Sequence, residues 1–592
     1  MYSAETKVCQ NCKASFTIDA SDFQFYEKIK VPPPTFCPEC RNQRRMAWRN
    51  ERTLYKRKCN APGHSEEVIS MYAPDSPCAI YDRDYWWSDG WDPLEWGREY
   101  DFKKPFFEQF KELLEGVPHI ALSNQNAVRT EYGNYLDGNK DCYLIFGGGW
   151  NENVRYSNKM MESKDSQDLY VASKNELCYE CINCVESYRL LYSMNCKNCA
   201  DSQYLYACRN CTNCFGCTNL VSKNYCIFNE QYSKEEYEKK LKEFALHTRK
   251  GREEAAKNFR DAYLKSIHRY ANVVNSPHST GDNVNNSKNC KFCFDMYHDA
   301  EDSKYLFSAL ALKDCYDGNG IYKNEASYEL VDANIGSSNF ASVTLYSSDH
   351  IQYSLDCHSS SCLFGCIGLR SKKYCILNKQ YPKEEYEKIL PKIIKHMNEV
   401  PFMDKGGRKY GYGEFFPIEL SPHAYNETIA QEYYALTKED ADKKSFAWRE
   451  DTKRGYDITV PPENLPETIN EVTDNILKEV IGCEHGAKCN EQCTAAFKLI
   501  SQELQFYRQM NLPLPRLCPN CRHYERFRKR NPLKLWRRSC TCAGEKSKSG
   551  VYANTARHFH GAEQCPNEFE TSYAPERSEI VYCEQCYQAE VV

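Results

Sequence analysis

The chain has 592 residues, a net charge of −5 and 41% hydrophobic residues. A chain of this length exceeds one hydrophobic core, so we expect three or more domains. Because the overall charge is slightly negative, any nucleic-acid surface must be a local basic patch. No run of about 18 apolar residues occurs and the residues after Met1 lack an apolar signal core, so we expect a cytoplasmic protein without a membrane span.

Thirty-four cysteines are the most unusual feature of the composition. Thiols stay reduced in the cytoplasm, so Cys-x-x-Cys pairs are interpreted first as metal ligands. The alternative is a disulfide-rich secreted protein. The whole pattern predicts a multidomain, β-rich chain, in which terminal zinc ribbons flank a duplicated, solenoid-like β-repeat core with interspersed helices.

Residues 1–80 are predicted to form a zinc-ribbon module. Cys9-x-x-Cys12 and Cys37-Pro-Glu-Cys40 form two knuckles whose four thiolates suit tetrahedral Zn²⁺. Residues 81–135 follow as an aromatic linker or cap, because four of the eight tryptophans fall within 86–96. Such a cluster either packs a linker against its neighbour or forms a stacking platform for a ligand, and packing is the more common role.

Two lobes of short β pieces, each followed by a helix, are predicted at 136–272 and 285–400. The first lobe aligns with a stretch 149 residues later, from Cys208 onward. Ser233 and Glu236 form a capping box that begins a helix expected to continue to about His268. The second helix should end before Pro401. The near-regular spacing favours stacked rungs of a solenoid over a mixed β-sheet domain.

Closely spaced cysteines inside the first lobe allow three interpretations. Cys208, Cys211, Cys214 and Cys217 form a possible metal set, for zinc or for an iron–sulfur cluster. Alternatively, they are small buried side chains stacked in successive rungs. The second lobe has serine and leucine in place of the two middle thiols, which favours stacking and makes an iron–sulfur cluster the least expected outcome.

After a linker with a helix at 401–480, residues 481–592 are predicted to form a double zinc-ribbon module. Its first part aligns without a gap with the N-terminal module, 481 residues away, and this repeat indicates a common structural unit. We expect about three structural Zn²⁺ sites in the chain. The two predicted in this module are Cys489, Cys493, Cys518 and Cys521, with Cys483 and His485 as competitors, and Cys540, Cys542, Cys583 and Cys586, with His558, His560 and Cys565 as substitutes.

The N-terminal module retains only part of the second of these sets. Cys59, His64 and Cys78 could hold a metal. However, Asp82 and Tyr85 stand where the C-terminal module has thiols, so we expect packing at this position.

The terminal units resemble the probable zinc-ribbon family, which has a CxxC knuckle, a Phe-Tyr pair and a Pro-x-x-Cys-x-x-Cys-Arg knuckle. The whole chain resembles uncharacterised cysteine-rich zinc-ribbon proteins of candidate-phyla bacteria. Both resemblances imply zinc binding and no activity. The residues that carry the first are Cys9, Cys12, Phe25, Tyr26, Pro34, Cys37, Cys40 and Arg41; the second is carried by Tyr85-Trp-Trp-Ser-Asp, Cys214-Phe-Gly-Cys217, Tyr412-Gly-Glu-Phe-Phe-Pro and Ala430-Gln-Glu-Tyr.

Basic clusters with interleaved aromatics follow the second knuckle of each terminal module. Such clusters suit phosphate contact and base stacking, so the first hypothesis is a zinc-dependent protein that binds nucleic acid, RNA or the ribosome preferred. The alternative for these residues is a solvated face, or pairing with acidic residues of the core. The predicted contact residues are Arg41, Arg44, Arg45, Arg49, Arg522, Arg526, Arg528 and Arg530.

Two further functions stay open at this stage. A protein-interaction scaffold would use the long surface of a solenoid to bind protein partners. An iron–sulfur or thiol redox enzyme would need a labile cluster or a reactive thiol. We assign no catalytic residue, because the sequence shows no Ser/His/Asp arrangement, P-loop or HExxH motif.

Overall fold

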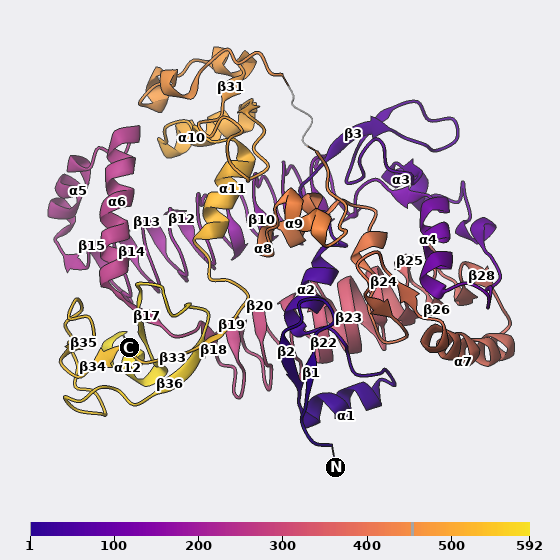
Figure 1. Ribbon diagram of the computed structural model, residues 1–592. Coiled ribbons are helices and arrows are strands. Elements are labelled where there is room, and N and C mark those ends of the chain that lie inside the picture. Colours follow the sequence, from indigo (N-terminus) through magenta and orange to yellow (C-terminus); the bar gives the residue numbers. More distant parts are fainter. Residues whose placement is uncertain (1, 451–454, 592) are drawn as a thin grey trace. The chain divides into compact units, whose positions relative to one another are not determined.

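The computed structural model describes residues 2–450 and 455–591, which form two compact units (Figure 1). Unit 1 comprises residues 1–124 and 271–450, and unit 2 comprises residues 125–270 and 451–592. The N-terminal module therefore folds with the second lobe, and the C-terminal module folds with the first lobe. The six consecutive segments expected from the sequence are regrouped crosswise.

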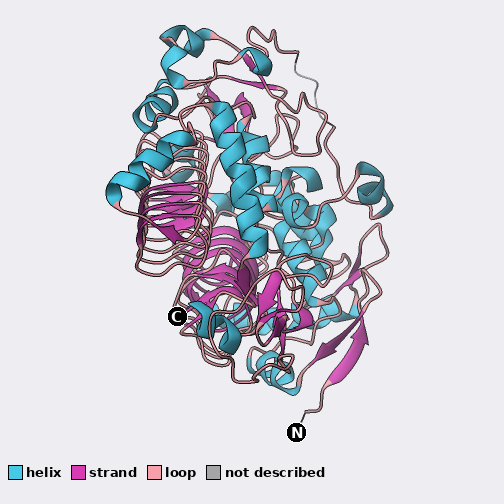
Figure 2. Ribbon diagram, turned by 90° about the vertical axis from the view of Figure 1, so that its left-hand side faces the viewer, coloured by secondary structure: helices cyan, strands magenta, loops and turns pink. Residues whose placement is uncertain are grey.

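Parallel strands paired at a constant spacing build the first lobe, and Figure 2 shows its successive turns of chain stacked on one another. Asn134 pairs with Phe146, Phe146 with Asn158, and Asn158 with Tyr170, always 12 residues further on. Isolated bridges such as Tyr170 to Ile182 continue the same spacing. The strands are β7 (Asn124–Gln125), β8 (Asn134–Asp137), β9 (Phe146–Gly149), β10 (Asn158–Met161), β11 (Tyr170–Ser173), β12 (Tyr188–Leu191), β13 (Ala200–Gln203), β14 (Thr212–Phe215), β15 (Asn224–Ile227) and β16 (Glu230–Gln231).

A residue in the left-handed region recurs at nearly every third position of the lobe. Asn195, Asn198 and Asp201, for example, have φ of 57°, 52° and 47°. Asn and Asp tolerate this region better than other side chains, which accounts for their frequency between the strands. The three-residue period brings every third side chain into the interior. The inward positions therefore include the buried cysteines Cys178, Cys181, Cys184, Cys196, Cys199, Cys208, Cys211, Cys214 and Cys217.

The second lobe repeats this arrangement in unit 1. Val331 pairs with Val343, and Val343 with Leu355, again 12 residues apart. Leucine, isoleucine and cysteine fill its interior. Its strands are β18 (Val273–Val274), β19 (Gly281–Asn285), β20 (Cys293–Met296), β21 (Phe307–Ala309), β22 (Lys313–Asn319), β23 (Tyr322–Ser337), β24 (Phe340–Gln352), β25 (Leu355–His358), β26 (Ser361–Phe364), β27 (Lys373–Ile376) and β28 (Lys379–Gln380).

Helices close both lobes. The predicted capping box is present at the start of α5 (Lys234–Glu243), where Ser233 and Glu236 exchange hydrogen bonds. The long helix expected after it is interrupted: α5 ends before Phe244, and α6 (Arg249–Lys265) begins anew with Thr248 as its N-cap. In the second lobe, α7 (Lys383–Glu399) ends before Pro401 as predicted.

In unit 1, the N-terminal module and the tryptophan-rich segment pack on the second lobe. Trp86 is fully buried and donates a hydrogen bond to the carbonyl of Pro118, and Trp91 joins the same core. The segment thus packs as a linker. The elements are β1 (Glu5–Val8), β2 (Ser15–Ile18), α1 (Ala20–Lys28), α2 (Pro38–Met46), β3 (Tyr55–Lys58), β4 (Glu67–Ser70), β5 (Ile80–Tyr81), α3 (Arg83–Trp87), η1 (Pro93–Trp96), α4 (Phe106–Gly116) and β6 (His119–Ile120), then β29 (Phe402–Met403), β30 (Lys409–Tyr410), η2 (Ile418–Leu420), η3 (Tyr425–Glu427), α8 (Ile429–Tyr433) and α9 (Lys438–Lys443).

In unit 2, the C-terminal module is joined to the first lobe through the parallel pair β17 (Ile267–Arg269) and β37 (Ile580–Tyr582). No helix of the described residues is long and apolar enough to cross a membrane. The linker before the module contains η4 (Pro462–Asn464), η5 (Ile469–Glu471) and η6 (Asp474–Lys478). The module's other elements are β31 (Ile481–Gly482), β32 (Ala496–Phe497), α10 (Ser501–Met510), α11 (Pro519–Arg528), β33 (Trp536–Ser539), β34 (Cys542–Ala543), β35 (Lys546–Ser547), β36 (Glu568–Thr571) and α12 (Glu584–Val591).

Candidate metal centres

The four thiols predicted at the N-terminus come together between the β1–β2 hairpin and the start of α2. Their sulfur atoms all lie within 4.8 Å of one another, and Cys12 and Cys37 are 3.7 Å apart. A tetrahedron of thiolates at 2.3 Å from Zn²⁺ has edges of ~3.8 Å. Cys9, Cys12, Cys37 and Cys40 therefore have the spacing of a structural metal site.

The four thiols of this tetrad shift one another's pKa in opposite directions. Hydrogen bonds from Cys37 and Cys40 hold the pKa of Cys9 far below its usual range. Hydrogen bonds with Cys40 and Cys9, together with burial, raise the pKa of Cys37 well above it. Four adjacent thiols cannot all ionise without a positive charge among them, and a divalent metal supplies it while releasing protons.

The first C-terminal tetrad is Cys483, Cys493, Cys518 and Cys521, which corrects the predicted set by one residue. Cys483 replaces Cys489. The reason is hairpin register: Cys483 directly follows β31, just as Cys9 directly follows β1. Cys489 lies in a longer loop between the two knuckle positions. Its sulfur is nevertheless 3.8 Å from that of Cys521, in a neighbouring group with His485 and Glu491.

The second C-terminal tetrad is Cys540, Cys565, Cys583 and Cys586, so Cys565 takes the place predicted for Cys542. The sulfur of Cys565 lies 3.8 Å from that of Cys583 and 3.7 Å from that of Cys586. Cys542 opens β34 and belongs to a second group, with His558, His560 and Cys586. The two groups share the thiol of Cys586.

The corresponding place in the N-terminal module holds a hydrogen-bonded cluster. Cys59 donates to Asp82 at 3.3 Å, and His64 lies 2.8 Å from the same carboxylate. Cys78 is directed elsewhere, to the carbonyl oxygen of Leu114 at 3.6 Å. Cys59, His64 and Cys78 are thus not assembled into one ligand set.

The arginines of α2 are buried in ion pairs with the second lobe. Arg41 and Arg45 both contact Asp317, at 2.9 and 3.0 Å, and Arg45 also contacts Glu329 at 2.7 Å. Arg44 lies between Glu329 at 2.7 Å and Glu414 at 2.8 Å. At most 2% of any of the three arginine side chains is exposed.

Unit 2 repeats the ion pairs of Arg41 and Arg45 at equivalent positions, whereas Glu525 stands where unit 1 has Arg44. Arg526 contacts Asp168 at 2.8 Å and Glu180 at 2.7 Å, and Arg522 lies 3.4 Å from Asp168. These arginines lie 481 residues after Arg41 and Arg45, and the carboxylates lie 149 residues before Asp317 and Glu329. Arg522 additionally pairs with Glu503 at 3.2 Å. The internal repeats thus extend to the interface between module and lobe.

This burial corrects the predicted role of most arginines in nucleic-acid contact. Arg41, Arg44, Arg45, Arg522 and Arg526 are at most 3% exposed, and their guanidinium groups face carboxylates rather than solvent. The alternative weighed from the sequence, pairing with acidic residues of the core, describes them better. Of the remaining three, Arg49 is 6% exposed and pairs with Glu51, Arg530 is half-buried, and the side chain of Arg528 is 56% exposed.

The cysteines inside the first lobe are satisfied by the backbone. Cys208 donates to the carbonyls of Tyr206 at 3.5 Å and Cys217 at 3.6 Å, and Cys211 does the same with its own neighbours. A metal-bound thiolate has no proton to donate, so these contacts favour buried thiols. Metal binding by Cys208, Cys211, Cys214 and Cys217 stays a prediction.

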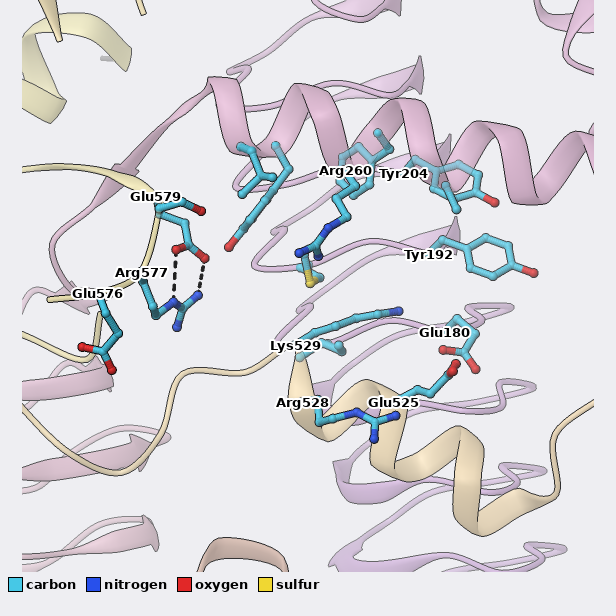
Figure 3. Close-up of a pocket in the computed structure, with 17 residues that line it drawn as sticks. Glu180, Tyr192, Tyr204, Arg260, Glu525, Arg528, Lys529, Glu576, Arg577 and Glu579 are labelled. Carbon is cyan, nitrogen blue, oxygen red and sulfur yellow. Dashed lines mark hydrogen bonds and ion pairs between the residues drawn. The ribbon is translucent and has the colours of Figure 1, made fainter. Parts of the chain in front are cut away.

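A cleft of about 780 Å³ in unit 2 was not anticipated from the sequence (Figure 3). Its floor is the outer face of the first lobe, with Tyr192 and Tyr204, and α6 forms one wall. The end of α11 and the segment 576–579 form the other walls. Arg260 and Lys529 extend from opposite walls, and Arg577 pairs with Glu579 at the rim. No local motif marks the cleft, because its walls come from four separate segments.

Comparison with known proteins adds no assignment to these sites. No family model matches the chain, and no curated protein matches it. The cysteine tetrads at both ends of the chain are therefore the feature that carries the metal-binding interpretation.

Proposed function

We propose that the protein is a zinc-stabilised binding scaffold, and that the cleft of unit 2 receives an extended segment of a protein partner. The zinc ions are structural in this account: closed four-thiolate sets hold the terminal modules in shape. The 12-residue stacks act as short β-solenoids, whose long faces offer binding surfaces. The observation that carries the proposal is the construction of the cleft, which combines lobe and module.

Two walls of the cleft depend directly on the tetrads. Cys518 is the N-cap of α11, and the helix ends at the exposed Arg528, followed by the exposed Lys529. The segment 576–579 leads through β37 to Cys583. Metal at the two C-terminal tetrads would therefore fix both walls relative to the lobe.

The charges of the cleft favour a peptide over a polyanion. Glu180 is paired with Arg526, and Arg528 with Glu491. Arg260 and Lys529 have no ion-pair partner within 4.0 Å among residues 2–450 and 455–591. They lie beside the stacked rings of Tyr192 and Tyr204, whose centroids are 4.9 Å apart. This combination suits a segment with an acidic side chain flanked by apolar ones, while Glu525 and Glu576, which also line the cleft, would repel a polyanion.

A displayed random-peptide library, selected against the full-length, zinc-loaded protein, tests the proposal. Selected peptides should carry an acidic residue between apolar ones. Their affinity, measured by fluorescence anisotropy, should fall at least ~10-fold in the Arg260→Glu/Lys529→Glu variant, since two favourable charge contacts become repulsive. The control Lys388→Glu/Lys392→Glu makes the same charge change on the exposed face of α7 and should bind normally. Equal binding by both variants would contradict the proposal.

Nucleic-acid binding is the second candidate function, and one observation favours it. The exposed cations Arg528 and Lys529 lie at the same cleft as the stacked rings of Tyr192 and Tyr204. Adjacent exposed cations can bind the phosphates of a nucleic-acid backbone. Salt titrations with labelled RNA, duplex DNA and single-stranded DNA test it. A steep salt dependence that disappears in Arg528→Glu/Lys529→Glu would favour this function over the scaffold.

A further inference from the structure

The group of donors around Cys586 contains more ligands than one metal ion can take. Four thiols, Cys540, Cys565, Cys583 and Cys586, already form a complete tetrahedral set. Cys542, His558 and His560 then remain beside the same Cys586, and the four donor atoms of this second group also lie within 4.8 Å of one another. We propose that the C-terminal module holds two metal ions, bridged by the thiolate of Cys586.

The imidazole of His560 has the orientation of a metal ligand. Its Nε2 lies 3.4 Å from the sulfur of Cys586, close to the ~3.6 Å expected between a nitrogen and a sulfur on the same tetrahedral Zn²⁺. Its other nitrogen, Nδ1, lies 2.7 Å from the carbonyl oxygen of Glu563 and must donate to it. This contact fixes the tautomer that leaves Nε2 free to bind a cation.

His558 is oriented in the same way by a carboxylate. Its Nε2 lies 3.0 Å from Glu590, and because a carboxylate only accepts hydrogen bonds, the Nε2–H group is the donor. The Glu590 side chain is held in turn by the backbone N–H groups of Thr555 and Ala556. The side chain of His558 is 1% exposed, and its Nδ1 has no hydrogen-bond partner among the described residues. An unprotonated, buried ring nitrogen is costly unless it binds something, and the second metal would be its partner.

Cys542 completes the second set. It is fully buried, and its sulfur accepts a hydrogen bond from the Asn554 side chain at 3.3 Å. Asn554 is positioned by the hydroxyl of Tyr582 at 2.7 Å. With five thiolates, two neutral imidazoles and two divalent ions, the cluster would carry a net charge of only −1. Five ionised thiols around a single divalent ion would carry −3, so ionisation of Cys542 is favoured only when a second ion is bound.

Metal analysis of the full-length protein gives the first test. With one ion at each of the other two tetrads, the protein should bind four zinc ions per chain, measured by inductively coupled plasma mass spectrometry. The His558→Ala/His560→Ala variant should lose one equivalent. The control His278→Ala/His298→Ala removes two exposed histidines far from any tetrad in sequence and should lose none. Identical metal content in the variant and the wild type would overturn the proposal.

A second measurement needs no substitution and so does not depend on the folding of a variant. In the protein loaded with Co²⁺, two ions that share a thiolate couple magnetically, whereas isolated ions do not. The spin count by electron paramagnetic resonance should therefore fall short of the total cobalt by about two ions per chain at low temperature. A spin count equal to the total cobalt would show isolated sites and overturn the bridge.

Discussion

Units 1 and 2 use the same interface between module and lobe but differ in what surrounds it. Asp317 and Glu329 receive α2 in unit 1, as Asp168 and Glu180 receive α11 in unit 2. These four carboxylates are paired with arginines of the docked helix in both units. The buried ion pairs therefore determine which face of the lobe the terminal module packs against. Buried charges are costly unless paired, so a module seated in another register would leave carboxylates without partners.

Around this shared interface, the two units have diverged in opposite directions. In unit 1, the position of Tyr204 is taken by Tyr353, which is fully buried under Tyr412 and Phe416. The segment that contains these two rings packs on the lobe there. In unit 2, Tyr204 is also nearly buried, beside Phe259 of α6, but the face that holds it lines the cleft. The groups that could hold a metal are also more numerous there. The ion-paired interface between module and lobe is thus common to both units, whereas the cleft and the additional donor groups are specific to unit 2.

The largest difference between the two units should be in the zinc lost when the equivalent cysteines Cys540 and Cys59 are replaced. Cys540→Ser should remove at least one zinc and unfold the C-terminal module, since a structural zinc contributes ~10 kcal/mol or more in isolated fingers. Cys59→Ser, at the equivalent position of the N-terminal module, should leave the zinc content unchanged, because Asp82 and His64 hydrogen-bond there instead. Metal analysis with circular dichroism measures both. Equal zinc loss in the two variants would contradict the expected difference between the C-terminal and N-terminal modules.

The buried ion pairs should give the next effect, and it should be similar in both units. Arg45→Ala and Arg526→Ala each remove a buried guanidinium shared by two buried carboxylates. Asp317 and Glu329 retain Arg41 and Arg44, and Asp168 retains Arg522, so each network loses one of its cations, at an expected cost of ~3–5 kcal/mol in the free energy of unfolding. Arg98→Ala removes an exposed pair with Glu112 and should cost ~0–1 kcal/mol. Urea denaturation measures all three. A cost for Arg45→Ala no larger than for Arg98→Ala would show that the pairs do not hold the interface.

The smallest effect is expected inside the first lobe. Cys211→Ser introduces the residue that the second lobe has at the equivalent Ser360, where the hydroxyl donates to the carbonyl of His358 at 2.8 Å. A hydroxyl can replace the thiol as donor, so we expect a loss of ~1 kcal/mol and unchanged metal content. Loss of a metal equivalent in this variant would instead support a metal set at Cys208, Cys211, Cys214 and Cys217.

The sequence predicted what depends on local spacing. The four cysteines predicted at the N-terminus lie together in one tetrad, because two short knuckles set their spacing. In the C-terminal module, the loop between the knuckles is longer, and the nearer Cys489 was chosen over Cys483. The register of the hairpin distinguishes the two cysteines. Phe16 and Phe497 are equivalent, and in each hairpin the cysteine lies two residues after the strand residue that pairs with this phenylalanine, which gives Cys9 and Cys483.

Long-range pairing could not be predicted in the same way. The phrase Asn-Cys-x-Asn-Cys recurs after 15 residues, one three-residue step beyond the 12-residue spacing of the strands, so local repetition alone obscured the period. From the sequence, nucleic-acid contact and pairing with acidic residues of the core both stay open for the basic clusters, because the carboxylate partners lie far away in sequence; Arg45 and Asp317, for example, are 272 residues apart. Only the folded chain shows that these charges neutralise one another.

The crosswise pairing of modules and lobes is the central claim, and hydrogen exchange of the Cys40→Ser variant tests it most directly. Loss of the N-terminal tetrad should release α2 from the second lobe. Mass spectrometry should therefore detect faster exchange in β22 and β23, with residues 134–227 of the first lobe unchanged. Faster exchange in the first lobe, with β22 and β23 still protected, would contradict the account.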